Sequence, residues 1–377
     1  MILNSKAIRL AWVFIFLAPL ILPKCVHAQD VHFSQFDNAN LIINPALTAS
    51  GVESGRISMQ AKQQWTRGLI NPFRTIFASY EAKINPCDVS NKHKWSYGFS
   101  IMNDDAGASN LTLTQVTGSL SYTYQMAEEI GFTLGALGGF NNRSFESGLL
   151  SAGNQYDPIL QIYDSSIPLE GIPDMFSTNF ETVGLGFNFY GKQSKVVNDE
   201  GVTTRQGRST LNFGGAIYNL TRPNVAFTTQ DYTSQLGFRY TLYMVPTIEL
   251  TRSVDLRFKA FAEFQNTYFE SLFDGGLVFH MKDAKNNPIS FGLSTGVRLW
   301  SLDNGIDPST NPNQIVDAII PAITASVKGV DVGFAFDINI SKFSEANNRR
   351  GGPELFIRKR IFNCLVTPPF RPNCNIF

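Results

Sequence analysis

The chain has 377 residues and carries 31 lysines and arginines against 31 aspartates and glutamates, so its formal charge is zero. This balance, without any run of basic residues, excludes the usual nucleic-acid binding proteins, and a hydrophobic fraction of 43% excludes intrinsic disorder. After residue 28 no apolar stretch approaches the roughly twenty residues of a membrane-spanning helix, which leaves a globular protein or a membrane β-barrel.

Residues 1–28 have the pattern of a secretory signal peptide. Lys6 and Arg9 precede the apolar stretch 10–22, and Val26-His27-Ala28 supplies a small-x-small cleavage site. The apolar stretch is too short to span a bilayer as a retained anchor. We therefore expect cleavage after Ala28 and export of the mature chain.

Residues 29–54 form a leading segment that precedes the first predicted strand. Its apolar residues are Phe33, Phe36, Leu41, Ile42, Ile43 and Leu47. This content is too high for a free periplasmic arm. We expect the segment to plug the domain that follows or to dock on a partner; the simpler alternative is a lead-in that packs under the mouth of that domain.

From about residue 55 onward, apolar residues alternate with small or polar ones, as in a β-strand with two different faces. Trp95, Tyr97 and Phe99 are one such row. The pattern predicts fourteen strands, near 55–65, 74–84, 95–103, 111–125, 130–143, 178–191, 209–219, 235–245, 254–267, 271–282, 288–300, 315–328, 330–341 and 353–361.

An even number of strands with these lengths is typical of an outer-membrane barrel. The polar face is mostly Gly, Ser, Thr and Asn, which favours a crowded and lightly charged lumen over the charged outer face of a soluble β-sandwich. We therefore predict an all-β fold, a transmembrane antiparallel β-barrel of about 14 strands, over residues 55–361.

The lengths of the connections predict which end of the barrel faces outward. Barrels have short periplasmic turns and longer outer loops. The connections 144–177, 220–234, 301–314 and 342–352 are long, whereas Ala127-Glu128-Glu129 and Lys328-Gly329 are tight. The long connections are therefore expected outside, with the connection 192–208 as an exception of considerable length on the inner side.

No group of residues has the pattern of a catalytic, cofactor-binding or metal site. His32, His93 and His280 are far apart, and only His280 lies on a predicted strand. Asp104 and Asp105 could bind a cation, although a polar loop tip explains them as well. We predict a protein without enzymatic activity or cofactor.

Three cysteines remain after removal of the signal peptide, in a compartment that favours disulfides. Cys364 and Cys374 lie in the tail 362–377, which is predicted to be periplasmic, and Cys87 lies in a predicted periplasmic turn. A bridge between Cys364 and Cys374 is expected, with Cys87 free or exchanged into the pair.

Several motifs resemble the PorP/SprF family of type IX secretion system outer-membrane proteins. The first signature is His32-Phe33-Ser34-Gln35-Phe36, and the second is Asn44-Pro45-Ala46-Leu47-Thr48. Gln64-Trp65, Pro72-Phe73-Arg74-Thr75 and the stretch 98–107 with Asp104 and Asp105 follow in the same order, although residue 63 is Gln where the family usually has Asn.

The resemblance implies a non-enzymatic outer-membrane component that helps a cargo protein with a C-terminal sorting domain to be secreted or attached at the cell surface. It implies other type IX secretion components as partners, including the periplasmic ring, together with the lipid bilayer of the outer membrane.

The connection 144–177 is the candidate surface for contact with a secreted partner. It contains Phe145, Tyr156 and Tyr163, which are aromatic in a predicted loop. A fold of the loop on itself would also explain them. The competing function is a diffusion pore or uptake channel, which would need a wide, charged lumen.

Overall fold

The computed structural model describes residues 33–52, 54–64, 72–88, 91–106, 111–127, 129–146, 155–157, 162–164, 175–193, 196–197, 203–205, 207–227, 234–266, 268–282, 287–302, 315–341 and 350–361. The predicted signal peptide and the predicted tail 362–377 lie outside these residues.

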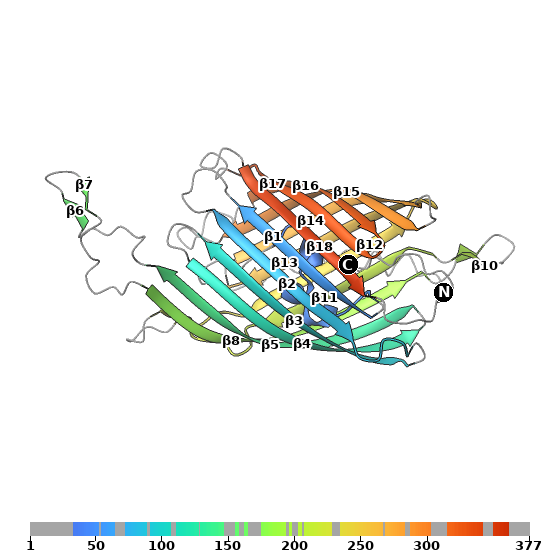
Figure 1. Cartoon of the computed structure of the whole chain (residues 1–377), viewed down its shortest axis with the longest axis horizontal. Helices are drawn as coiled ribbons and strands as arrows, with labels where there is room; N and C mark the ends of the chain where they lie inside the picture. The colour runs from blue at the N-terminus through green and yellow to red at the C-terminus, as the bar shows by residue number, and fades with distance from the viewer. Residues whose placement is uncertain are drawn as a thin grey trace, which may run out of the picture.

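In this part of the chain, fourteen antiparallel strands close into one barrel (Figure 1). Their bounds are β1 (Gly55–Gln64), β2 (Phe73–Lys83), β3 (His93–Ala106), β4 (Leu111–Ala127), β5 (Ile130–Glu146), β8 (Met175–Lys192), β11 (Thr210–Tyr218), β12 (Arg239–Glu249), β13 (Val254–Gln265), β14 (Tyr268–Lys282), β15 (Pro288–Leu302), β16 (Ile315–Val327), β17 (Val330–Asn339) and β18 (Arg350–Ile361). The barrel closes where β1 pairs with β18, from Gly55 opposite Ile361 to Lys62 opposite Glu354.

Two small sheets lie in the connections. β6 (Tyr156–Asp157) pairs with β7 (Ile162–Tyr163) between β5 and β8. β9 (Val196–Val197) pairs with β10 (Thr203–Arg205) between β8 and β11. We call the end of the barrel that carries β6 and β7 the long-loop end, and the end that carries β9 and β10 the short-turn end (Figure 1).

The prediction of a fourteen-stranded barrel is confirmed, and the largest differences in strand bounds have a structural reason. β12 was expected at 235–245 but occupies 239–249, because Gln235 instead forms a bridge with Asn224 and the alternating pattern continues through Pro246. β5 and β8 pair as far as Glu146 opposite Met175, so both extend beyond their predicted ends.

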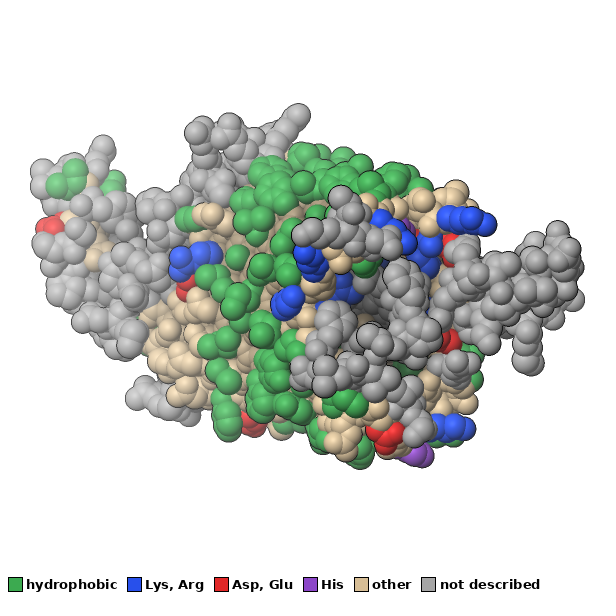
Figure 2. Space-filling model, turned by 45° about the vertical axis from the view of Figure 1, so that its right-hand side comes forward, with side chains coloured by type: hydrophobic (Ala, Val, Ile, Leu, Met, Phe, Trp, Pro, Cys, Tyr) green, Lys and Arg blue, Asp and Glu red, His purple; other side chains and the backbone are tan. Residues whose placement is uncertain are grey.

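Apolar side chains cover the outer face of the wall. Phe99 is 61% exposed, Phe140 79% and Phe334 39%, and each lies in an outward row of its strand. Figure 2 shows hydrophobic side chains over much of the visible wall. Such a surface is stable against lipid and would be a liability in water. None of the helices in the described part of the chain is long and apolar enough to span a bilayer.

The prediction of a lightly charged lumen is wrong. The inward rows contain many buried charged residues, namely Arg56, Lys62, Glu81, Arg239, Asp255, Lys259, Glu263, Glu270, Arg298, Asp331, Asp337, Glu354, Arg358 and Arg360. Each strand that contributes them carries one to three, at alternate positions, so none of them forms a continuous run of charge in the sequence. Inside the closed barrel these rows face each other, so opposite charges meet.

Candidate functional site

The leading segment lies inside the barrel and is the candidate functional site. It consists of three short helices, η2 (Phe36–Asn38), α2 (Asn40–Ile43) and η3 (Pro45–Leu47). All side chains from Phe33 to Ala49 are buried. Helices this short are unstable alone in water, so their conformation depends on contacts with the wall.

The first signature motif is held by two carboxylates of the wall. Glu354 Oε2 and Oε1 accept hydrogen bonds from the backbone N–H groups of Ser34 and Gln35, both at 2.7 Å. The Ser34 hydroxyl donates to Asp337 Oδ1 at 2.6 Å. β18 and β17 therefore fix the start of the described segment.

Those two carboxylates are compensated by cations from other strands. Lys62 Nζ lies 3.2 Å from Asp337 Oδ2 and 3.7 Å from Glu354 Oε2. Arg298 Nη1 lies 2.8 Å from Asp337 Oδ2. A buried charge is tolerated only when it is paired and hydrogen bonded, and here β1 and β15 supply the pairing.

The second signature motif is held by backbone groups as well as side chains. The Asn44 amide donates to the Phe187 carbonyl at 2.7 Å, to the Gly215 carbonyl at 3.1 Å and to the Tyr243 hydroxyl at 3.2 Å. Its Oδ1 accepts from the Ala46 N–H at 2.8 Å, which caps η3. One side chain thus joins the helix to β8, β11 and β12.

Glycines make room for this motif. A Cβ added at Gly135 of β5 would lie less than 3.0 Å from backbone atoms of Pro45 and Ala46, and one at Gly186 of β8 would overlap the Asn44 side chain. Any other residue would push the segment away from the wall. These glycines therefore serve the close approach of the leading segment.

The end of the segment is fixed by a fully buried ion pair. Arg56 Nη2 lies 2.6 Å from Glu81 Oε2, and neither side chain is exposed. The same guanidinium donates to the Leu47 carbonyl at 2.8 Å and to the Ser50 carbonyl at 2.9 Å, while Glu81 Oε2 accepts from the Ala49 N–H at 2.8 Å. Wall and segment share one network.

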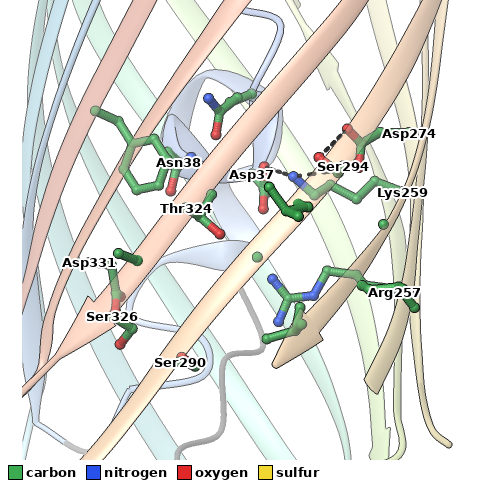
Figure 3. A pocket seen from close by; sticks show the side chains of 18 of the residues that line it. Asp37, Asn38, Arg257, Lys259, Asp274, Ser290, Ser294, Thr324, Ser326 and Asp331 are labelled. Atoms are coloured by element: carbon green, nitrogen blue, oxygen red, sulfur yellow. Dashed lines mark hydrogen bonds and ion pairs between the residues drawn. The ribbon is translucent and has the colours of Figure 1, made fainter. Parts of the chain in front are cut away.

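A further ion pair joins the middle of the segment to β13. Asp37 Oδ1 lies 3.0 Å from Lys259 Nζ, and Figure 3 shows the two side chains meeting beside Asp274. Burial raises the pKa of the Asp37 carboxyl, but the Lys259 ammonium with its hydrogen bond and the charges of Arg257 and Arg358 together lower it by more, so this pKa lies below its usual value. The pair is therefore ionised at neutral pH.

A small polar cavity adjoins this pair (Figure 3). Its volume is about 50 Å³, and its charged lining residues are Asp37, Asp274, Asp331, Arg257, Lys259 and Arg358. The three acids and three bases leave it without net charge. The space suffices for a few water molecules but not for a solute-conducting channel.

Aromatic packing completes the fit. The ring of Phe36 stacks on Phe261 at 5.1 Å between centroids, and Phe33 meets Phe77 edge to face at 6.3 Å. The Tyr218 hydroxyl donates to the Leu41 carbonyl at 3.0 Å. Apolar contacts thus alternate with the ionic ones along the segment.

The two signature motifs predicted from the sequence lie together in the structure. Phe33 to Phe36 and the residues Asn44, Pro45, Ala46, Leu47 and Thr48 are brought together in the lumen. The Thr48 hydroxyl donates to Pro45 O at 2.7 Å and is hydrogen-bonded to the Ser119 hydroxyl at 2.9 Å. His32 and Trp65 lie outside the described residues.

Asp104 and Asp105 do not lie in a loop tip, because β3 continues to Ala106. The Asp104 carboxylate accepts from the Thr75 hydroxyl at 2.6 Å, and Asp105 pairs with the exposed Arg74 at 2.8 Å. Both carboxylates therefore join β3 to β2. Among the described residues no group of His, Cys, Asp and Glu has the arrangement of a metal site.

The aromatic residues of the predicted loop 144–177 are separated in the structure. Phe145 lies in β5, not in a loop, and stacks on Phe176 at 4.8 Å and against Phe227 at 4.9 Å. Tyr156 and Tyr163 are paired between β6 and β7. β5 and β8 are longer than predicted because their pairing, together with this aromatic contact, continues toward the long-loop end beyond the lipid-facing part of the wall.

His280 takes part in an ion-pair cluster at the short-turn end. Its Nε2 lies 2.7 Å from Asp255 Oδ2, which Arg208 also contacts. Arg208 reaches the Thr251 carbonyl at 2.7 Å. These contacts join strand ends and the connection before β11.

Cys87 is disulfide-bonded, so the alternative in which Cys87 is free is wrong. Cys364 and Cys374 lie outside the described residues, and their pairing with each other stays a prediction.

The sequence did not predict that residues of the wall hold the segment. Glu81, Asp337 and Glu354 are acids at inward positions of their strands. That position was the available signal, because an isolated charge on a lumen face requires a partner. The partner itself could not be found, since it comes from a distant part of the chain.

A closed fourteen-stranded barrel with an apolar outer wall and an occupied interior defines a membrane β-barrel protein with a built-in N-terminal segment. Residues 26–357 match the model of the family described as "Type IX secretion system membrane protein PorP/SprF". The chain belongs to this family, and the resemblance seen in its motifs is confirmed.

No curated protein matches the chain. Among solved structures it is similar to a deltaS2 mutant of the TodX monoaromatic hydrocarbon channel, with 9% identity, 86% of this chain and 94% of that chain covered, and a TM-score of 0.40. It is also similar to CdiB from Escherichia coli, with 8% identity, coverage of 80% and 62%, and a TM-score of 0.42. A bacterial polysaccharide outer membrane secretin gives 8% identity, coverage of 82% and 99%, and a TM-score of 0.38.

Proposed function

We propose that this protein is a non-enzymatic outer-membrane scaffold of the type IX secretion system, which assists the secretion or surface attachment of a cargo protein carrying a C-terminal sorting domain. Family membership supports the place in the secretion system. The observation that carries the scaffold role is the leading segment, whose two signature motifs are bound to the lumen wall at Glu354 and through Asn44.

A lumen filled in this way fits a binding scaffold better than a diffusion pore. Hydrogen bonds and buried ion pairs from β1, β2, β11, β12, β13, β17 and β18 hold the segment across the interior. A segment bound from so many sides is rigid. We propose that residues 29–54 act as a plug and that binding takes place at the rims of the barrel.

The long-loop end is the proposed cargo surface and faces the exterior of the cell in this proposal. Its connection between β5 and β8 is the longest predicted one, and it carries the exposed residues Tyr156 and Ile162. The periplasmic ring would then meet the short-turn end.

Removal of the β5–β8 connection tests this proposal. Since Glu146 and Met175 are paired, a two-residue Asn-Gly turn can replace 147–174 without changing the barrel. We expect the shortened protein to fold, as shown by heat-modifiable migration in gels, and cargo display at the cell surface to fall. Unchanged display of all secreted proteins by the shortened protein would refute the cargo role of this rim.

Conductance in planar bilayers tests the plug. The purified full-length protein should show no stable open channel. Steady, ion-selective channels from the intact protein would instead favour the alternative function, an uptake channel.

A further inference from the structure

Within the described part of the chain, one stretch of β8 lacks a neighbouring strand on one side. β8 pairs with β11 only from Lys192 to Leu185, with one more bond where Val183 accepts from Leu220 N–H at 3.2 Å. β11 ends at Tyr218, and the chain leaves the wall from Asn219 onward, so it no longer runs beside β8. On the other side β8 remains paired with β5 as far as Met175.

The direction of the backbone groups follows from the ladder. In an antiparallel strand, both backbone groups of a residue point to the same neighbour, and successive residues alternate. The Val183 carbonyl and the Gln193 N–H both point toward the β11 side, so odd-numbered residues face that side. The N–H and C=O groups of Ser177, Asn179 and Glu181 therefore form an edge with no strand beside it among the described residues.

This edge begins at the margin of the lipid-facing belt, where Glu181 is opposite Phe140, and continues beyond it through Asn179 and Ser177. The outward row of β8 changes from Leu185 and Phe187, which are 49% and 41% exposed, to Ser177, Asn179 and Glu181. Figure 1 shows β5 and β8 reaching beyond the neighbouring strands toward the end that carries β6 and β7. The edge is thus placed in water, where a free strand edge is a template for another strand.

We propose that the edge of β8 at Ser177–Glu181 binds an extended segment of a protein partner as an added β-strand. The other face of β8 here carries Phe176, packed in the cluster with Phe145 and Phe227. A matching segment would alternate, with apolar residues toward the barrel mouth and polar residues outward. Backbone bonds would supply affinity, and the aromatic cluster would select the apolar positions.

The inference rests on the proposed function for the source of the partner, which is the secreted cargo protein. The test compares two variants at one position. Asn179→Pro removes the N–H that points to the free edge and leaves the backbone pairing with β5, because the backbone groups of residue 179 do not point to that side; both variants lose the side-chain bond from Asn142. Asn179→Ala changes the side chain and keeps the N–H.

Hydrogen exchange of the full-length protein is measured in detergent and in native outer membranes that contain the secretion machinery. We expect the amides of Ser177, Asn179 and Glu181 to exchange rapidly in detergent and at least about fivefold more slowly in native membranes, the effect of one backbone hydrogen bond. Asn179→Pro should abolish this protection at the two remaining amides, and Asn179→Ala should keep it.

Slow exchange already in detergent would overturn the inference, since another part of this chain would then cover the edge. Equal rapid exchange in both preparations would also overturn it. Suppose that removal of 147–174 abolishes cargo display, while Asn179→Pro keeps both normal display and normal protection of the Ser177 and Glu181 amides. That result would refute the strand-addition inference and would still support the proposed function.

Discussion

Replacing Gly135 by alanine should loosen the leading segment from the wall. The added Cβ would stand less than 3.0 Å from backbone atoms of Pro45 and Ala46, in a region where both elements are buried. Backbone cannot rotate away as a flexible side chain can, so the segment must shift. Overpacking of this kind costs about 1–3 kcal/mol, which corresponds to a roughly 5- to 150-fold larger population of the undocked segment.

Limited proteolysis of the folded barrel measures that population, because cleavage within 33–54 requires the segment to leave the lumen. Gly138→Ala is the matched control, since a Cβ at Gly138 of the same strand meets nothing within 4 Å. We expect faster cleavage and intermittent channel conductance for Gly135→Ala, and wild-type behaviour for Gly138→Ala. Equal cleavage rates for the two variants would refute the close-approach argument.

Three further outcomes follow from the same contacts. Asn44→Ala removes three donated bonds and the η3 cap and should destabilise docking by about 3 kcal/mol, measured as protease sensitivity; a change below about 0.5 kcal/mol would contradict it. Glu81→Gln leaves a buried guanidinium unpaired and should lower barrel stability in denaturant by about 3–5 kcal/mol, whereas Arg74→Ala, at a pair whose arginine is 60% exposed, should cost at most about 1 kcal/mol. Asp37 has a lowered pKa, so its stabilisation is present above about pH 4 and is lost as the pH falls through the lowered value. Thermal unfolding of Asp37→Asn should lack that acid-dependent part, and a wild-type stability that does not fall further than that of the variant below about pH 4 would count against the role of Lys259.

The barrel itself was predictable because each strand has its own pattern. The alternation in β3, with Trp95, Tyr97 and Phe99 in one row, depends only on the side-chain period of a strand and on lipid facing one side. All fourteen strands were found in this way, and errors were confined to their ends. The end of β12 depended on a bridge between Asn224 and Gln235, which is a contact between two connections and leaves no periodic trace.

The lumen was misjudged for a different reason. The leading segment was recognised as too apolar to be free, but plugging, docking and simple packing were equally compatible with its composition. Its partners Glu354 and Asp337 lie more than 300 residues away in sequence from Ser34. No local pattern links groups so far apart.

The amino-acid sequence by itself determined the membrane-facing wall, because burial against lipid acts on every residue of an outward row and repeats along the chain. Only the tertiary structure decided what fills the lumen and where β8 extends beyond its pairing with β11. Both depend on closure of the barrel, which brings Arg56 to Glu81 and Asp37 to Lys259, and on β11 ending before β8 does. Such pairings are set by distance in space, and a charge is stable inside the barrel only when closure has placed its partner there.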